Sequence, residues 1–193
     1  MFFSHHLPSE RPSVKAFWLS LTLCLLASQA TSWAKVYASV PEALDAAFPG
    51  ARIERATVYL TDAQVQAIED RAGSKLPSAI VHPYRAYNDD GHLMGTAYFD
   101  AHLVRTLPET LMVIVTPEAT IAGVTVLSFK EPQEYKPSER WYAQFVKTSL
   151  NDELQLKRGI DGVTGATLTA RATTSAARRS LAIHHVLEAG ATP

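Results

Sequence analysis

The chain contains one cysteine in 193 residues, and that cysteine, Cys24, lies close to the N-terminus. A single thiol cannot form an intramolecular disulfide, and residues 35–193 contain neither a thiolate metal site nor a CxxCH sequence for haem attachment. Any redox chemistry in those residues therefore requires a cofactor that is held in another way.

Other common signatures are also missing. The 18 basic and 19 acidic residues nearly balance and form no basic block, so nucleic acid is not an expected partner. The chain has no GxGxxG sequence for a nicotinamide cofactor and no GxSxG elbow of a serine hydrolase. Glu131, Glu134 and Glu139 have no histidine beside them, which favours a surface loop over a metal site.

Residues 1–34 have the layout of a secretory signal peptide. Two basic residues precede an apolar run over residues 16–30, and small residues stand before a predicted cleavage after Ala34. We therefore expect export across the inner membrane to the periplasm. The mature chain, residues 35–193, is expected to form a single domain without a transmembrane segment. An uncleaved membrane anchor is the alternative, although its apolar run is shorter than the roughly 20 residues that span a bilayer.

Two segments have sequences typical of capped helices. Ser39 and Glu42 form one capping box, and Thr61 and Gln64 form another. Gly73 can close the second helix in the left-handed conformation. Two further helices are expected, one over residues 138–146 and a long final one that begins within residues 167–169.

The middle of the chain changes from helix-like to strand-like composition. Segments rich in β-branched and aromatic residues are separated by turn sequences, such as residues 88–91 and 116–118. This pattern predicts a mainly antiparallel sheet of about four or five strands with packed helices, which is an α+β fold. Pro83 indicates that its strand lies at an edge of the sheet or is interrupted.

A short polar stretch, residues 161–172 (DGVTGATLTARA), leads into the final helix. The first turn of a helix has unpaired amide groups and a partial positive charge, which attract an anion such as phosphate. Gly165 and Ala166 leave the backbone accessible, and Thr167 supplies a hydroxyl that can donate a hydrogen bond or be esterified. Asp161 can cap the turn or serve as a recognition point for a modifying enzyme. An ordinary polar turn with an N-cap is the alternative.

Residues 161–167 resemble the D-x-x-[ST]-G-A-[ST] flavinylation motif of the FMN-binding domain family, which includes the C subunit of the sodium-translocating NADH:quinone reductase and the G subunit of the Rnf complex. In that family the last threonine carries FMN through a phosphoester bond, which a secreted, magnesium-dependent flavin transferase installs from FAD. The resemblance implies an FMN-binding domain over residues 35–193 with covalent FMN at Thr167. The other implied cofactor-binding residues are Asp161, Thr164, Gly165, Ala166, Leu168 and Thr169.

A second segment, LSFKEP, is similar to the H-x-E-T-P-G sequence that ends a strand in the same family. Glu131 and Pro132 match, which implies a role for Glu131 in cofactor binding. Phe129 stands in place of the histidine, the threonine is absent and Gln133 replaces the glycine. The resemblance extends over roughly residues 91–187.

Two further polar residues lie in a predicted loop between strands. Arg105 is a candidate flavin contact, because a positive charge near the isoalloxazine ring favours its reduced form. A structural salt bridge or a solvated loop is the alternative, and for His102 it is the stronger interpretation. Trp141 is expected to pack in the core.

These features predict an exported flavoprotein whose covalent FMN transfers electrons from a donor to an acceptor among extracytoplasmic or membrane redox partners. Such a carrier is more strongly indicated than an enzyme with its own small-molecule substrate, such as a flavin reductase. The alternative from another class is a non-redox binding or sensor module that holds a phosphate-bearing ligand or noncovalent FMN at the same loop.

Overall fold

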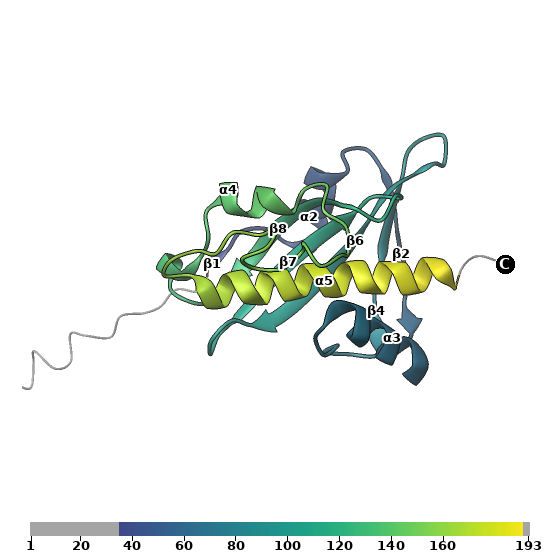
Figure 1. The fold of residues 1–193 in the computed structure, drawn as a ribbon. Helices are drawn as coiled ribbons and strands as arrows, with labels where there is room; N and C mark the ends of the chain where they lie inside the picture. The colour runs from purple at the N-terminus through teal and green to yellow at the C-terminus, as the bar shows by residue number, and fades with distance from the viewer. Residues whose placement is uncertain (1–34, 191–193) are drawn as a thin grey trace, which may run out of the picture. The chain divides into compact units, whose positions relative to one another are not determined.

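The computed structural model describes residues 35–190, which are built around a six-stranded antiparallel sheet (Figure 1). The predicted signal peptide lies outside the described residues. A separate pair, β3 (Val58–Tyr59) and β4 (Ile80–Val81), is also antiparallel. In spatial order, the six strands are β1 (Lys35–Val36), β8 (Ile121–Phe129), β7 (Pro108–Val115), β6 (Leu93–Leu103), β5 (Tyr84–Tyr87) and β2 (Arg52–Arg55).

Alternate residues of the sheet contribute to two separate apolar cores, because successive side chains of a strand point to opposite faces. On β7, Leu111 and Val113 belong to the core that includes the helices α3 (Asp62–Ala72) and α5 (Thr167–Ala189). Met112 belongs to the core that includes the helix α2 (Val40–Ala47). Figure 1 shows α5 running across the strands. The predicted α+β class with a mainly antiparallel sheet is confirmed.

Both predicted capping boxes are present. The Ser39 side chain accepts from the amide of Glu42, whose carboxylate in turn accepts from the Ser39 amide, and Thr61 and Gln64 make the equivalent pair. Gly73 ends α3 with a φ of 68°, a left-handed conformation that costs glycine little. The local sequence therefore determines where α2 and α3 begin and where α3 ends.

Pro83 is predicted to mark either a sheet edge or an interruption, and the structure shows the interruption. Pro83 lies between β4 and β5, and β5 pairs on both sides. One expectation needs correction. The single helix expected over residues 138–146 is a short α-helix, α4 (Glu139–Tyr142), followed by one 3₁₀ turn, η2 (Ala143–Phe145). A second 3₁₀ turn, η1 (Gln133–Tyr135), precedes them.

The helices of the described residues are too short or too polar to cross a bilayer.

Candidate functional site

The loop that precedes α5 is anchored by the short helical segment α4–η2. The indole Nε1 of Trp141 donates to the carbonyl oxygen of Asp161 at 2.7 Å, and the amide of Asp161 donates to Oε1 of Gln144 at 3.0 Å. Trp141 is buried, as predicted. Its hydrogen bond to the loop, and the role of Gln144, have no signal in the sequence.

Backbone geometry at Gly165 explains why the loop contains a glycine. Gly165 has a φ of 83°, a conformation that side chains disfavour. The amide of Ala166 then bonds to the carbonyl oxygen of Val163 at 3.2 Å, which closes a tight turn directly before Thr167. The small residues of the motif therefore allow the chain to turn into α5.

The first turn of α5 lacks a side-chain cap. Its N-cap residue is Ala166, whose methyl group cannot accept a hydrogen bond. The first amide groups of the helix therefore remain available to an anion, and the helix dipole adds a partial positive charge there.

Thr167 and Thr169 differ in exposure. Thr167 is exposed, and its hydroxyl donates to the carbonyl oxygen of Val163 at 3.1 Å. Because the hydroxyl is the donor in this bond, the lone pairs of its oxygen are not used by it. Thr169 is buried, and its hydroxyl donates to the carbonyl oxygen of Tyr135 at 2.6 Å. Thr167 is therefore the accessible hydroxyl of this turn, whereas Thr169 fastens α5 to the η1 segment.

A cavity of about 190 Å³ opens beside Thr167 and joins segments that are distant in sequence. The Arg105 guanidinium carbon lies 4.9 Å from the centre of the Tyr135 ring, in cation–π geometry. The residues that line the cavity are Arg105, Tyr135, Gly165, Ala166, Thr167, Leu168 and Thr169. The structure thus brings Arg105 to the motif, while Asp161, Thr164 and Glu131 lie outside the cavity lining.

Glu131 instead fixes the turn that carries Arg105. The side chain is buried, and its Oε1 accepts from the amides of Arg105, Thr106 and Leu107 at 3.1, 2.8 and 2.8 Å. Burial acts to raise the pKa of Glu131, but the three amide donors and the charge of Arg105 outweigh it and lower the pKa below its usual value. Glu131 is therefore a carboxylate that holds the β6–β7 turn.

His102 lies in β6 and not in the predicted loop, and it makes the salt bridges that were its alternative interpretation. Its Nδ1 is 2.9 Å from Asp100 and its Nε2 is 3.1 Å from Glu109. Arg179 of α5 also binds Asp100, at 2.8 and 2.9 Å. The hydroxyls of Tyr142 and Thr173 donate to Glu109, which completes a buried polar network between the sheet, α4 and α5.

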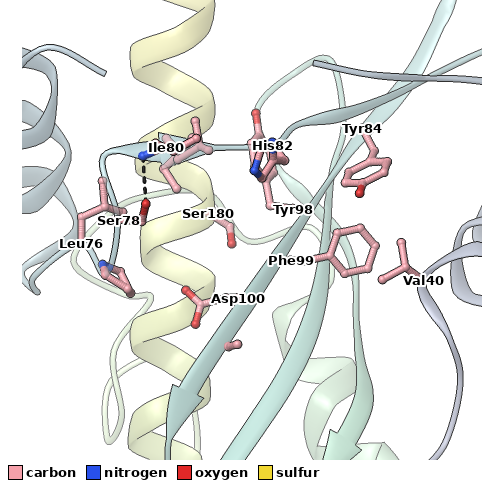
Figure 2. A pocket seen from close by; sticks show the side chains of 14 residues that line it. Val40, Leu76, Ser78, Ile80, His82, Tyr84, Tyr98, Phe99, Asp100 and Ser180 are labelled. Carbon is pink, nitrogen blue, oxygen red and sulfur yellow. Dashed lines mark hydrogen bonds between the residues drawn. The ribbon is translucent and has the colours of Figure 1, made fainter. Parts of the chain in front are cut away.

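A second pocket, of about 230 Å³, lies elsewhere and shares no lining residue with the cavity at Thr167 (Figure 2). Its walls are mostly apolar and aromatic, with Phe99 and Ile80 among them. The buried hydroxyls of Tyr98 and Ser180 are already bonded, to His184 and to the carbonyl of Ala176. The uncapped amides, the accessible hydroxyl and the cation are all at the smaller cavity, which is therefore the candidate site.

Comparison with known families gives one match. Residues 107–182 match the sequence model of the FMN-binding domain. The match covers 76 of the 193 residues and supports the resemblance to the FMN-binding domain family. The matched segment contains β7, β8, the loop before α5 and most of α5, so it supports FMN as the cofactor. The matched segment is shorter than the region of roughly residues 91–187 over which the motifs resemble the family. Arg105 lies just before the matched segment. No curated protein and no solved structure matches the chain.

Proposed function

We propose that this protein is an exported flavoprotein that carries FMN on Thr167 through a phosphoester bond and passes electrons between two redox partners. One observation carries the proposal. Within an FMN-binding domain, Thr167 presents an exposed hydroxyl at the uncapped first turn of a long helix.

The residues at this turn suit a flavin phosphate. The free amide groups and the helix dipole favour an anion, and Gly165 and Ala166 place no large side chain over the backbone. Arg105, which also lines the cavity, adds a positive charge. These groups would hold the phosphate, and Tyr135 and Leu168 supply apolar surface beside it.

Attachment requires one substitution at phosphorus. The Thr167 oxygen attacks the FMN phosphorus of FAD, which forms a new P–O bond and breaks the pyrophosphate bond, so that AMP leaves. The hydroxyl proton is taken up by a base of the flavin transferase or by water, and no atom changes its oxidation state. The chain contributes an accessible hydroxyl, which the hydrogen bond to Val163 orients.

Covalent attachment suits an exported carrier. The bound flavin supplies reversible one- or two-electron transfer. An ester bond prevents loss of the cofactor outside the cell, where no pool replaces it. The partners that follow from this proposal are a flavin transferase, an electron donor and an electron acceptor.

Flavin fluorescence on a denaturing gel tests the attachment. The protein is exported from a host that also expresses a flavin transferase, together with the variants Thr167→Ala and Thr167→Ser. We expect a fluorescent band for the wild type and for Thr167→Ser, which keeps the hydroxyl, and none for Thr167→Ala. Fluorescence that persists in Thr167→Ala would place the flavin elsewhere.

A noncovalent FMN or phosphate binder is the second candidate, because the same uncapped amides would hold a phosphate without an ester. In that case none of the three proteins keeps flavin after denaturation. The folded wild type would still bind added FMN. The denaturing gel therefore distinguishes the two candidates by whether the wild type keeps its flavin.

A further inference from the structure

We infer that Arg105 is the phosphate-recognition residue of the cavity at Thr167, and that Glu131 is the positioning residue that holds it there. Together they make the site select FMN over riboflavin, which lacks the phosphate. The inference rests on the proposed function and assigns separate roles to two residues that the sequence could only place near a flavin.

Arg105 supplies the only charged side chain among the described residues that line the cavity. It shares that cavity with the first-turn backbone of α5 and with the Thr167 hydroxyl, the atom that would carry the phosphorus. Its guanidinium has no salt-bridge partner within residues 35–190. A guanidinium without a salt bridge and uncapped amide groups, in one cavity, suit phosphate oxygens, because both donate hydrogen bonds to an anion.

Glu131 fixes the backbone at Arg105 without forming a salt bridge to its guanidinium. Its Oε1 is occupied by three consecutive amides of the turn, including that of Arg105 itself. The turn is also closed by a hydrogen bond of 3.1 Å from the Val104 amide to the Leu107 carbonyl. The carboxylate thus binds the backbone of the turn and leaves the guanidinium available to a ligand.

Tyr135 holds the guanidinium from the side of η1. Its ring lies under Arg105, and its carbonyl accepts from the Thr169 hydroxyl in the first turn of α5. The distance between the cation and the phosphate position is therefore set by contacts that exist before any ligand binds. Such preorganisation lowers the entropic cost of binding.

A Thr167→Ala background, which cannot form the ester, allows affinity to be measured at equilibrium. We would titrate this protein with FMN and with riboflavin by fluorescence, then repeat the titrations after Arg105→Gln, Arg105→Lys, Glu131→Gln and Glu131→Ala. Arg140→Gln and Glu134→Ala are the matched controls, since both residues are exposed and neither lines the cavity.

Arg105→Gln should weaken FMN binding by about tenfold, the typical effect of losing a charged hydrogen bond, and leave riboflavin binding unchanged. Arg105→Lys should recover part of the loss, because the charge remains but the planar fork does not. Both Glu131 variants should reduce FMN binding selectively, with the smaller effect for Glu131→Gln, which keeps an acceptor oxygen. An unchanged ratio of FMN to riboflavin affinity in Arg105→Gln would overturn the inference, and so would an equal loss of both ligands.

Inorganic phosphate supplies a second measurement if the Thr167→Ala protein binds FMN too weakly to titrate. Phosphate added to the unmodified wild type should shift the amide NMR signals of residues 167–169 to saturation, and Arg105→Gln should abolish the saturation. Absence of any shift in the wild type would refute the inference. Failure of covalent attachment is detected separately, on the denaturing gel, so the two outcomes remain distinguishable.

Discussion

Single residues at this site make contacts that differ from the roles suggested by the sequence motifs. Glu131 matches a family motif for cofactor binding, yet its carboxylate contacts three backbone amides and lies outside the cavity lining. Arg105 is one of two polar candidates in the same segment, and only the fold shows that it lines the cavity with Thr167 while His102 lies in a salt-bridge network. A sequence motif indicates where a site lies, but the direction of each side chain depends on pairings between distant strands.

Loss of the Glu131 carboxylate should destabilise the protein. Glu131→Ala leaves three amide donors of the β6–β7 turn without their acceptor, and one unsatisfied donor typically costs about 1–3 kcal/mol when buried. Because water reaches part of this turn, we expect a total decrease of about 1–3 kcal/mol in the free energy of unfolding, measured by urea denaturation. Glu134→Ala is the control, and an equal stability of the two variants would contradict the role assigned to Glu131.

His102 should make stability depend on pH. Burial acts to lower the pKa of His102, but its bonds to Asp100 and Glu109 outweigh burial and raise the pKa. A folded-state pKa above the unfolded value of about 6.5 means that protonated His102 stabilises the fold fully below that pH. The stabilisation then declines as pH rises through the folded-state pKa.

Urea unfolding between pH 6 and 9, in steps across the range around the histidine value of about 6.5, measures this dependence. The wild type should lose stability as pH rises, and His102→Gln should show a flatter profile. His82→Gln is the control variant, because His82 is exposed. Parallel profiles for the wild type and His102→Gln would show that His102 does not carry the dependence.

At the scale of elements, local signals were sufficient where a few neighbouring residues decide the structure. The capping boxes at Ser39 and Thr61 and the closing Gly73 predicted helix ends correctly. The polar strand β2, of sequence RIER, gave no such signal, because it is defined by its pairing with β5. The helix expected over residues 138–146 is also shorter than its local sequence predicts. After η2 the Lys147 amide donates to the Ile121 carbonyl at 2.7 Å, a contact with β8 that the sequence does not signal.

The link between α4 and the loop before α5 can be tested on its own. Trp141→Phe keeps most of the buried aromatic surface but removes the indole donor to Asp161. We expect faster amide hydrogen exchange in residues 161–166 and a loss of about 0.5–1.5 kcal/mol in the free energy of unfolding. Amides of α3 serve as the internal reference. Equal acceleration in α3 would indicate general destabilisation in place of a local effect.

For the whole molecule, the sequence predicted the α+β class and the family from composition and one motif, both of which are confirmed. The composition of the cavity was only partly predictable. Residues 165–169 are contiguous and lie together for local reasons, whereas Arg105 and Tyr135 reach them through the β6–β7 hairpin and the segment after β8. Contacts of that kind depend on the register of the sheet, which a single sequence does not specify.

The most direct test of the central claim is the intact mass of the exported protein, denatured so that unattached ligands are removed, from a host that expresses a flavin transferase. The account predicts that the wild type gains the mass of one FMN less one water and that Thr167→Ala gains nothing. The same unmodified mass for both proteins would contradict covalent attachment at Thr167.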